Sequence, residues 1–435
     1  MKPIANLTES QAVADNSTAS FNVAIVGFGT VGSSVARILA ERSVAGVCVS
    51  HVCNRNVQRK RVNWLPESVC WTENIDDVLS SDAQVVIELM GGLEPASETI
   101  RRALKSGKSV ITANKQLIAR HGAELIRLAR ENGQHIAFGA SVAGGVPVIS
   151  GLQEGLAGDD LVELVGILNG TCNYILTRIE TGVSFSDALR EAQKLGFAEA
   201  DPTEDVDGLD ARAKLAILAR TGLRVSAKLE SIPARTISAI EPIDFEYARL
   251  LNCTIRQLSR ARKEDNRLLA SVEPGLVHSS SPLAGVDGPR NLVMSTGRFG
   301  GETIFAGHGA GGHPTAVAVV SDLIAIARSR QVNGAALYES EVPEIQVSAD
   351  FTSRHYMRFT VQDEPGIIAK LALIFSNLGI NIDSVFQKPG FPSSKLPFVI
   401  TLEPCPSSLV DQAMQQITRL EFHVQPPLNL PILDK

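Results

Sequence analysis

The chain lacks the features that mark membrane and secreted proteins. No hydrophobic stretch approaches the roughly 18 residues that a membrane-spanning helix needs. The six cysteines form no C-x-x-C pair or disulfide framework, which suits free thiols in a reducing compartment. The first 20 residues are polar and lack both an apolar signal core and the Arg-rich bias of a transit peptide. We therefore expect a disordered leader over 1–20 and a soluble, cytoplasmic protein.

The chain also lacks a large excess of charge of one sign. The formal net charge of -6 argues against nucleic acid or an anionic membrane as a partner. Small, diffusible ligands are the expected partners instead. A chain of 435 residues exceeds what one hydrophobic core usually serves, so we expect several domains.

A glycine-rich turn follows the first apolar segment, which reads as a strand over 22–26. The turn, which leads into a helical pattern, consists of Gly27, Phe28, Gly29, Thr30, Val31 and Gly32. Gly27 permits the tight turn, Gly29 lets the backbone approach a pyrophosphate, and Gly32 allows close helix packing. We therefore expect this turn to bind a dinucleotide cofactor. The alternative is a glycine turn that only joins a strand to a helix.

The second strand of this unit, predicted over 44–52, leads into a basic segment. An NAD-specific site places Asp or Glu near the end of this strand, whereas this chain has Arg55 followed by further basic residues. Arginine is the natural partner of a 2′-phosphate, so Arg55 favours NADP over NAD. The alternative is a solvated basic loop without a ligand.

Strands and helices continue to alternate up to about residue 150. Strands are predicted over 83–89, 108–112 and 134–138, with a helix over 95–106. Lys115 follows the strand over 108–112, at the carboxyl edge of the sheet where open α/β folds bind ligands. We therefore expect an α/β, Rossmann-type nucleotide-binding domain over 21–150.

A second domain of α+β character is predicted over 151–335, with catalytic and dimerisation roles. It begins with a strand over 161–168, after which Asn169 and Thr171 either cap a helix or line a pocket. Further strands are predicted over 236–240, 268–272, 292–296 and 303–306. A glycine-rich segment then opens a helix over 314–329, which we expect to pack back on the Rossmann domain.

The stretch 195–214 is unusual because six carboxylates precede one lysine. Glycine and proline divide it into turns, and its last part reads as the start of a helix. Asp210 and Lys214 then lie four residues apart on one helical face, and Asp205 and Glu199 precede them in a loop. We expect these carboxylates to converge on the ammonium group. The alternative is an acidic loop with an exposed ion pair. Such a pair contributes only about 0.3–0.5 kcal/mol to folding stability.

The run Gly-Phe-Ala-Glu-Ala-Asp-Pro within this stretch, followed by Asp, Gly-Leu-Asp and Lys, resembles the signature of homoserine dehydrogenases. The segments Asn-Gly-Thr-Cys-Asn-Tyr over 169–174 and Ala-Asn-Lys over 113–115 resemble the same family. The resemblance covers about residues 22–330. It implies an NAD(P)-dependent oxidoreductase that interconverts L-homoserine and L-aspartate 4-semialdehyde in threonine, methionine and isoleucine biosynthesis.

The same resemblance implies roles for individual residues. Lys214 would transfer the proton to or from the substrate oxygen, and Asp210 would orient that lysine and the substrate. Lys115 would assist at the oxygen beside the nicotinamide. Glu199 would bind the substrate ammonium group, with Asp205 supporting the substrate site.

A cation site, a further cofactor contact and an oligomer are also implied by the resemblance. The loop that starts at Gly139 would hold a monovalent cation such as sodium through backbone oxygens of Val142, Gly144 and Val146. The family often has Glu at the position of Gly139, so a plain turn is the alternative. Gly311 would contact the cofactor, and the protein would form a homodimer or homotetramer.

A third domain is predicted over 354–435, after a linker over 336–353. Its pattern predicts the order βαββαβ. The segments 363–366 and 379–382 resemble an ACT domain, an amino-acid-sensing module. The resemblance implies that threonine acts as an effector and that the effector site contains Asp363, Gly366, Gly379 and Asn381. Because the module contains none of the proposed catalytic residues, we expect it to be dispensable for the chemistry.

Two other functions stay open from the sequence. Cys172 could be the nucleophile of a semialdehyde dehydrogenase that forms a thioester, although no histidine lies near it in sequence and a buried thiol is the alternative. The chain could also be a non-catalytic amino-acid sensor with a vestigial Rossmann domain. The complete glycine turn and the presence of Lys115, Glu199, Asp210 and Lys214 argue against a sensor.

Overall fold

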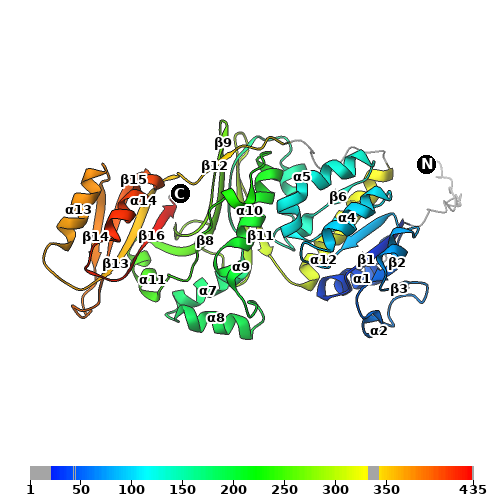
Figure 1. Ribbon diagram of the computed structural model, residues 1–435, viewed down its shortest axis with the longest axis horizontal. Coiled ribbons are helices and arrows are strands. Elements are labelled where there is room, and N and C mark those ends of the chain that lie inside the picture. The colour runs from blue at the N-terminus through cyan, green and yellow to red at the C-terminus, as the bar shows by residue number, and fades with distance from the viewer. Residues whose placement is uncertain (1–20, 43, 45, 332–341, 434–435) are drawn as a thin grey trace, which may run out of the picture.

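The computed structural model describes residues 21–42, 44, 46–331 and 342–433, so the predicted leader over 1–20 lies outside the described residues. Three parts follow one another along the longest axis of the molecule, with the nucleotide-binding part at one end and the C-terminal module at the other (Figure 1). Across the described residues, no helix combines the length and the apolar character that crossing a membrane requires.

The first part is built on a six-stranded parallel sheet. Its strands are β1 (Phe21–Val26), β2 (Val47–Cys53), β3 (Cys70–Thr72), β4 (Val85–Glu88), β5 (Ser109–Thr112) and β6 (Ile136–Ala137). They lie in the order β3-β2-β1-β4-β5-β6, and every pair is parallel. This is the strand order of dinucleotide-binding folds, which bind their ligand where the order reverses between the first and fourth strands. The predicted Rossmann-type fold is confirmed.

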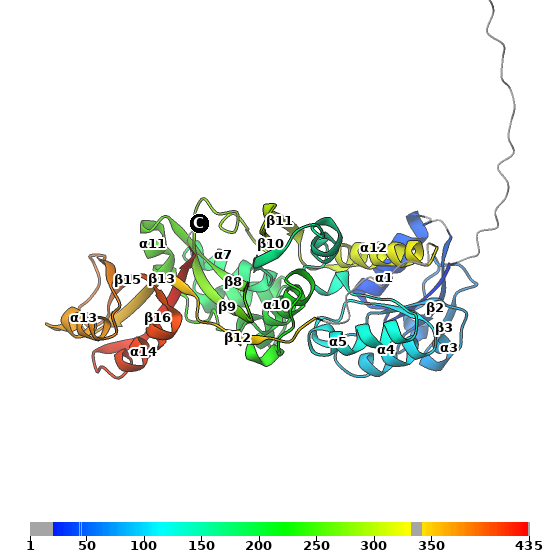
Figure 2. The same ribbon diagram turned by 90° about the horizontal axis from the view of Figure 1, so that it is seen from above.

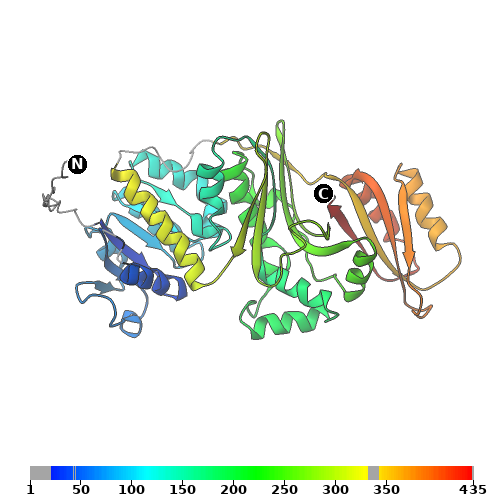
Figure 3. The ribbon, with the colours of Figure 1, turned by 180° about the vertical axis from the view of Figure 1, so that it is seen from behind.

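Helices cover both faces of this sheet, as the buried strands β4 and β5 require. They are α1 (Thr30–Arg42), α2 (Val57–Lys60), α3 (Ile75–Leu79), α4 (Ala96–Lys105) and α5 (Lys115–Glu131). Helix α1 shares one face with α12 (Gly312–Gln331), whereas α4 and α5 pack on the other (Figures 2 and 3). Helix α12 therefore returns from the second part onto the Rossmann sheet, as we predicted for 314–329.

The second part contains a mostly antiparallel sheet with helices packed against it. Its strands are β7 (Leu161–Ile167), β8 (Cys253–Glu264), β9 (Arg267–His278), β10 (Arg290–Gly297) and β11 (Gly301–His308), in the order β11-β10-β7-β8-β9. The longer helices of this part are α7 (Gly170–Glu180), α8 (Phe185–Lys194), α10 (Leu209–Gly222) and α11 (Pro242–Leu250). The short turns of helix are α6 (Val148–Ser150), α9 (Thr203–Val206), η1 (Gly139–Ser141), η2 (Gly151–Gly155) and η3 (Leu229–Ser231).

Two predictions for the second part differ from the structure. The strand predicted over 236–240 is wrong, because the chain turns there and the Ile240 N–H donates to the carbonyl of Ile237 at 3.1 Å. Both isoleucines are buried in that loop, so their apolar character reflects burial rather than a strand. Strand β8 has no counterpart among the predicted strands.

The C-terminal module has the predicted order of elements. It consists of β13 (Thr352–Val361), α13 (Ile367–Asn377), β14 (Ile382–Gln387), β15 (Leu396–Pro406), α14 (Ser407–Ile417) and β16 (His423–Leu433). Strand β16 runs well beyond the segment that the sequence predicts. Its last residues Ile432 and Leu433 pair in parallel with Leu276 and Val277 of β9, so the module extends the sheet of the second part.

The predicted linker over 336–353 is partly structured. Strand β12 (Gln346–Ser348) lies within it and pairs in parallel with β9, while residues 336–341 lie outside the described residues. The description of 342–353 as a plain linker is therefore wrong.

The module also shares a hydrophobic core with the second part. Tyr356, Val399, Leu430 and Ile432 of the module pack with buried residues of α7, α11 and β8. The hydroxyl of Tyr247 in α11 donates to the carbonyl of Pro397 at 3.0 Å. Removing the module would uncover this core. The expectation that the module is dispensable for the chemistry stays a prediction, but the shared core makes the stability of the second part depend on the module.

Candidate active site

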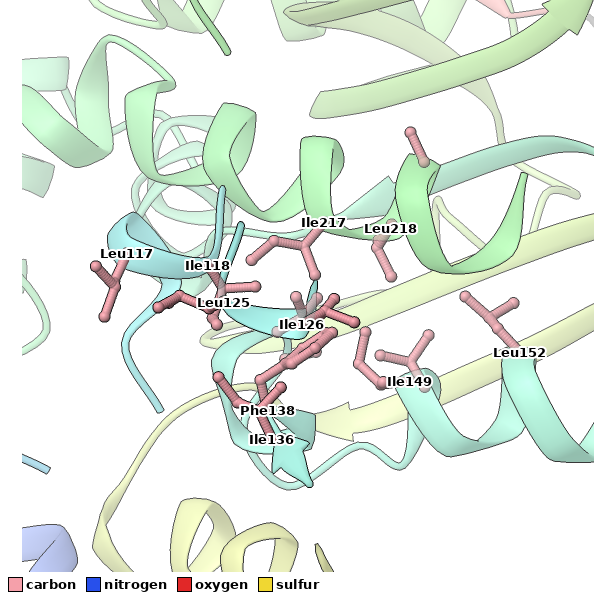
Figure 4. Close-up of a cluster of buried hydrophobic side chains, with 14 of the residues drawn as sticks. Leu117, Ile118, Leu125, Ile126, Ile136, Phe138, Ile149, Leu152, Ile217 and Leu218 are labelled. Atoms are coloured by element: carbon pink, nitrogen blue, oxygen red, sulfur yellow. The ribbon is translucent and has the colours of Figure 1, made fainter. Parts of the chain in front are cut away.

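Two helices that carry lysines, α5 and α10, are fixed to each other by a common core. Figure 4 shows the apolar side chains of the two helices facing one another, with Ile118 and Ile126 on α5 and Ile217 and Leu218 on α10. Lys115 is the first residue of α5, and Lys214 lies in the second turn of α10. The packing therefore fixes the positions from which both lysine side chains project.

Asp210 lies between these two lysines. Its Oδ1 is 2.6 Å from Nζ of Lys115, and its Oδ2 is 2.7 Å from Nζ of Lys214. The side chains of Asp210 and Lys214 are only 5% and 12% exposed, whereas that of Lys115 is 40% exposed. The i,i+4 pair predicted between Asp210 and Lys214 is confirmed. The alternative of an exposed ion pair is wrong, because the pair is largely buried.

The electrostatics keep Asp210 and Lys115 ionised. Burial raises the pKa of the Asp210 carboxyl, but the charges of Lys214 and Lys115 outweigh burial and hold it well below its ordinary value. Burial likewise lowers the pKa of Lys115, but the Asp210 carboxylate outweighs burial and raises it above its ordinary value. At neutral pH, Asp210 is therefore a carboxylate beside a protonated Lys115.

Asp205 lies beside this cluster and is joined to it through Asn169. The Asn169 amide nitrogen donates to Asp205 Oδ1 at 2.7 Å and to Asp210 Oδ2 at 2.8 Å. Burial raises the pKa of the Asp205 carboxyl, in spite of the hydrogen bond from Asn169. The prediction that Asn169 caps a helix is confirmed, because its Oδ1 accepts a hydrogen bond of 2.8 Å from the Cys172 N–H at the start of α7. The bridge between two carboxylates was not predicted, since no local pattern signals it.

Glu199 stands apart from the lysines. It lies in the exposed loop after α8, and within the described residues its carboxylate makes no hydrogen bond or ion pair. The expected convergence on the Lys214 ammonium group therefore holds for Asp210, with Asp205 beside it, and is wrong for Glu199. The structure also brings two ammonium groups to one carboxylate, that of Asp210.

Cys172 is buried at the start of α7. Its Sγ donates to the carbonyl of Asp205 at 3.0 Å. Burial, together with the carboxylates of Asp205 and Asp210, raises the pKa of the thiol well above its ordinary value. A thiolate is disfavoured here, which argues against a thioester-forming nucleophile. Thr171 beside it donates to the carbonyl of Phe197 at 2.7 Å.

The glycines of the first turn are sterically required. A Cβ on Gly27, which has φ of 102°, would lie 2.6 Å from the carbonyl carbon of Leu89. A Cβ on Gly32 would lie 2.0 Å from the carbonyl oxygen of Gly27, so only glycine lets α1 start this close to the turn. Nothing lies within 4 Å of a Cβ on Gly29, which leaves that backbone open to a ligand.

The other residues of the turn differ in their surroundings. Thr30 and Val31 form the start of α1, where N–H groups are free to meet a pyrophosphate. Phe28 is buried against Trp64 and Trp71, and its N–H donates to Asn54 Oδ1 at 2.9 Å. Both its ring and its N–H are engaged inside the protein, and the prediction that Phe28 contacts the cofactor stays a prediction.

Two predicted cofactor residues lie elsewhere around this turn. Arg55 follows β2 in an exposed position, and in the described part of the chain its guanidinium makes no ion pair. Gly311 directly precedes Gly312. A Cβ on Gly312 would lie 2.8 Å from Cγ2 of Thr30. The second glycine-rich loop therefore rests directly against the start of α1.

The predicted cation loop is tightly packed. Val142 and Val146 are buried, and the loop between them turns through the left-handed conformations of Ala143 and Gly144. The Val146 carbonyl accepts from the N–H of Val148 at 2.7 Å, which leaves it a second lone pair. A monovalent cation at these oxygens stays a prediction.

At Gly139 the chain differs from the family pattern for a physical reason. The Gly139 N–H donates to Oδ2 of Asp322 in α12 at 2.8 Å, and a Cβ on Gly139 would lie 2.7 Å from the other oxygen of that carboxylate. The space that a glutamate side chain would enter is therefore occupied by a carboxylate from another helix. Among the described residues, no cluster of three His, Cys, Asp or Glu side chains could hold a metal ion.

The predicted effector residues divide into two pairs. Asp363 and Gly366 line a cavity of about 330 Å³ between β13, α13 and the end of β14. Gly379 and Asn381 lie at the opposite end of β14, where Asn381 Nδ2 donates to Glu403 at 3.0 Å. The prediction that all four share one site is therefore wrong within a single chain.

Comparison with known proteins agrees with this geometry. Residues 27–139 match the family model described as homoserine dehydrogenase, NAD binding domain, and residues 147–324 match the model described as homoserine dehydrogenase. The homoserine dehydrogenase of Bacillus subtilis is 38% identical over 381 residues, which are 85% of this chain and 88% of that protein. The homoserine dehydrogenase of a Synechocystis species is 36% identical over 429 residues, which are 94% of this chain and 99% of that protein.

Solved structures agree as well. The structure of a homoserine dehydrogenase from Thiobacillus denitrificans has a TM-score of 0.88 and 32% identity, covering 95% of this chain and 98% of that one. A hyperthermophilic archaeal homoserine dehydrogenase in complex with NADPH has a TM-score of 0.61 and 28% identity, covering 71% of this chain and 98% of that one. With its nicotinamide-binding domain, this chain therefore belongs to the homoserine dehydrogenase family of NAD(P)-dependent oxidoreductases.

Proposed function

We propose that the cluster of Lys115, Asp210 and Lys214 performs the proton transfer in the reversible oxidation of L-homoserine to L-aspartate 4-semialdehyde. The observation that carries this proposal is the position of the Asp210 carboxylate between two ammonium groups at the starts of two packed helices. Reduction of an aldehyde needs a group that gives a proton to the carbonyl oxygen. The two ammonium groups that the buried Asp210 carboxylate holds are candidates for this proton donor.

Each residue of the cluster has one role in this reaction. A bound nicotinamide cofactor supplies or accepts the hydride. In the reductive direction, the Lys214 ammonium gives its proton to the carbonyl oxygen, and the aldehyde becomes the primary alcohol. In the oxidative direction, the neutral Lys214 amine takes the hydroxyl proton. Lys115 donates a hydrogen bond to the same oxygen, and Asp210 orients both lysines.

Substrate recognition falls to the loop before α10. Glu199 would bind the substrate ammonium group through a charge-assisted contact, and Asp205 would support the substrate site. This role is supported by the exposure of Glu199, whose carboxylate is not committed to another group among the described residues.

We also propose a preference for NADP over NAD. The basic residues after β2, Arg55, Arg59, Lys60 and Arg61, support this preference, because all four are exposed near the end of the strand that meets the adenosine ribose. A monovalent cation such as sodium would be held by Val142, Gly144 and Val146. Thr30, Val31, Gly29 and Gly311 would contact the cofactor.

Regulation by threonine is the proposed role of the C-terminal module. The module resembles an ACT domain, and Asp363 and Gly366 line a cavity of a size that suits an amino acid. Gly379 and Asn381 would join such a site only from a second copy of the chain, which supports a homodimer or homotetramer as the regulated form. Threonine inhibition of the full chain, and its loss in Asp363→Ala, would test this role.

One assay tests the proposed function. The purified full chain would be given L-homoserine and either NADP+ or NAD+, and the absorbance of the reduced nicotinamide would be followed. We expect turnover that Lys214→Ala and Asp210→Asn abolish and that Cys172→Ser leaves intact. Absence of turnover with both cofactors, or turnover that depends on Cys172 and not on Lys214, would overturn the proposal.

A further inference from the structure

We infer that the end of β7 is a positioning device for the proposed proton donor, formed by the Leu168 carbonyl and the Asn169 side chain. This inference rests on the proposed function of Lys214. The Leu168 carbonyl accepts a hydrogen bond of 2.8 Å from Nζ of Lys214. The next residue, Asn169, holds Asp210, which is the carboxylate partner of the same lysine. Two consecutive residues thus contact both members of the Asp210–Lys214 pair.

The hydrogen bonds of Lys214 leave a single direction for the substrate. An ammonium group has three N–H bonds. One points to Asp210 Oδ2 at 2.7 Å and one to the Leu168 carbonyl at 2.8 Å. The third N–H is the one left to reach a substrate oxygen. The direction of proton transfer is therefore set by the two protein acceptors and not by the lysine alone.

The amide of Asn169 is fully used, and its orientation is fixed. Its Oδ1 accepts from the N–H of Cys172 at 2.8 Å, which caps α7. The amide nitrogen must then face the acids, where its two hydrogens meet Asp205 Oδ1 at 2.7 Å and Asp210 Oδ2 at 2.8 Å. The side chain is only 3% exposed, so water does not compete for these bonds. Turning the amide over would break all three contacts.

This bridge keeps two carboxylates in fixed places beside one lysine. Asp205 and Asp210 carry like charges, and the donor between them offsets their repulsion. Without the donor, Asp210 Oδ2 would lose one of its two contacts and keep only its ion pair with Lys214, and Asp205 would compete for the ammonium group. Asn169 is therefore a positioning residue for hydride transfer, in addition to capping α7.

The sharpest test is Asn169→Asp, which keeps the shape and the capping oxygen but replaces the amide donor with an acceptor. We expect kcat for homoserine oxidation to fall roughly 10²-fold at about pH 8, the loss typical of a small misplacement of reacting groups. The dissociation constant of NADP+ should not change. As the pH falls toward 6, a proton on the introduced carboxyl restores one donor. The ratio of variant to wild-type kcat should therefore rise.

Two further variants separate positioning from helix capping. Asn169→Ser keeps a capping oxygen but cannot bridge both acids, so it should lose kcat without recovery at low pH. Ser184→Ala removes the cap of the neighbouring helix α8, where Ser184 accepts from the Asp187 N–H at 3.2 Å, and should leave kcat unchanged. The melting temperature of each variant would be measured in parallel.

The outcomes are decisive in both directions. A wild-type kcat in Asn169→Asp would overturn the inference, and so would a loss that is equal in both Asn169 variants and independent of pH. Lys214→Ala would be assayed in the same series. If Lys214→Ala retains turnover, the proposed function itself fails. If Lys214→Ala is inactive and Asn169→Asp is normal, only the positioning role fails.

Discussion

The guanidinium of Arg358 donates a hydrogen bond of 2.8 Å to the carboxylate of Asp244, although 114 residues separate the two along the chain. Asp244 lies in the first turn of α11 and Arg358 in β13 of the C-terminal module. Their side chains are 0% and 4% exposed. The hydroxyl of Tyr356 donates to the other oxygen of the same carboxylate at 2.8 Å. The module is therefore joined to the catalytic part by a buried polar contact.

We predict that Arg358→Ala destabilises the protein strongly, because it leaves the Asp244 charge buried without its main partner. The expected loss is about 3–5 kcal/mol of unfolding free energy. Arg354→Ala is the matched control, since Arg354 lies on the same strand but pairs with Asp383 at a partly exposed position and should cost at most about 1 kcal/mol. Thermal and denaturant unfolding of both variants would measure the difference. Equal losses would contradict a buried interdomain contact.

The burial of Asp244 leads to a prediction about how the stability of the folded protein depends on pH. Burial raises the pKa of its carboxyl to about 6, in spite of the charge of Arg358. The folded protein therefore holds a proton on Asp244 at pH values where the unfolded chain has lost it. This contribution to stability is present below about pH 4 and is lost as the pH rises through 6. At pH 7.5 the difference amounts to about 3 kcal/mol.

The measurement for this prediction compares wild type with Asp244→Asn at several pH values. Asparagine does not titrate, so the melting temperature of wild type relative to the variant should rise as the pH falls from 7.5 to 5. Taking the difference between the two proteins removes the contributions of all other carboxyls. A difference that stays constant across this pH range would show that Asp244 does not titrate there.

Lys214→Ala should lose hydride transfer because the proposed proton donor is gone. The expected loss in kcat is roughly 10²–10⁴-fold, as is typical for a general acid, while the affinity for NADP+ survives. Lys194→Ala, at the exposed end of α8, is the control and should keep wild-type kinetics. Near-normal turnover in Lys214→Ala would show that another residue is the proton donor.

Glu199→Gln should chiefly weaken homoserine binding, because a carboxylate that faces an ammonium group makes a charge-assisted contact. We expect KM for homoserine to rise with little change in kcat. Glu204→Gln is the control in the same stretch, since Glu204 accepts a hydrogen bond from Gln116 at 3.1 Å. An unchanged KM in Glu199→Gln would assign the substrate ammonium group to another carboxylate.

Arg55→Ala should lower the preference for NADP+ over NAD+, because an exposed arginine after the second strand suits a 2′-phosphate. The ratio of the two kcat/KM values is the measurement. Neighbouring basic residues share this surface, so a triple variant that also lacks Arg59 and Lys60 completes the test. If the ratio does not move in the triple variant, the preference is set elsewhere.

Sequence patterns predict the nucleotide-binding part and the pairing of Asp210 with Lys214 well, because local spacing determines both. The requirement for Gly32 comes from the carbonyl of Gly27, five residues earlier, and the ion pair needs only a helix. Strand β8 escapes prediction because buried polar residues interrupt its apolar pattern: Arg256, Gln257, Ser259 and Arg260 all lie inside. Their partners, such as Glu273 for Arg260 at 3.2 Å, come from other strands, and the local sequence does not reveal them.

The surroundings of Lys115 and Glu199 show the same limit. Nothing in the sequence near Lys115 indicates that it meets Asp210, since this contact depends on how α5 packs on α10. Glu199 lies in an acidic motif together with Asp205 and Asp210, yet it is exposed and the described lysine pairs of the site are made by Asp210. Membership of a motif predicts the class of chemistry. The distances within the site come from the packing of whole helices.

The pairing of β16 with β9 has a consequence for how the protein is made. Strand β9 and the helices of the catalytic part leave the ribosome long before β16 is synthesised, and domains generally fold as units in that order. The hydrophobic core between α7, α11 and β8 stays incomplete until Leu430 and Ile432 arrive. A chain interrupted before β16 would therefore expose this apolar surface, although the helices that carry Lys115 and Lys214 are already made.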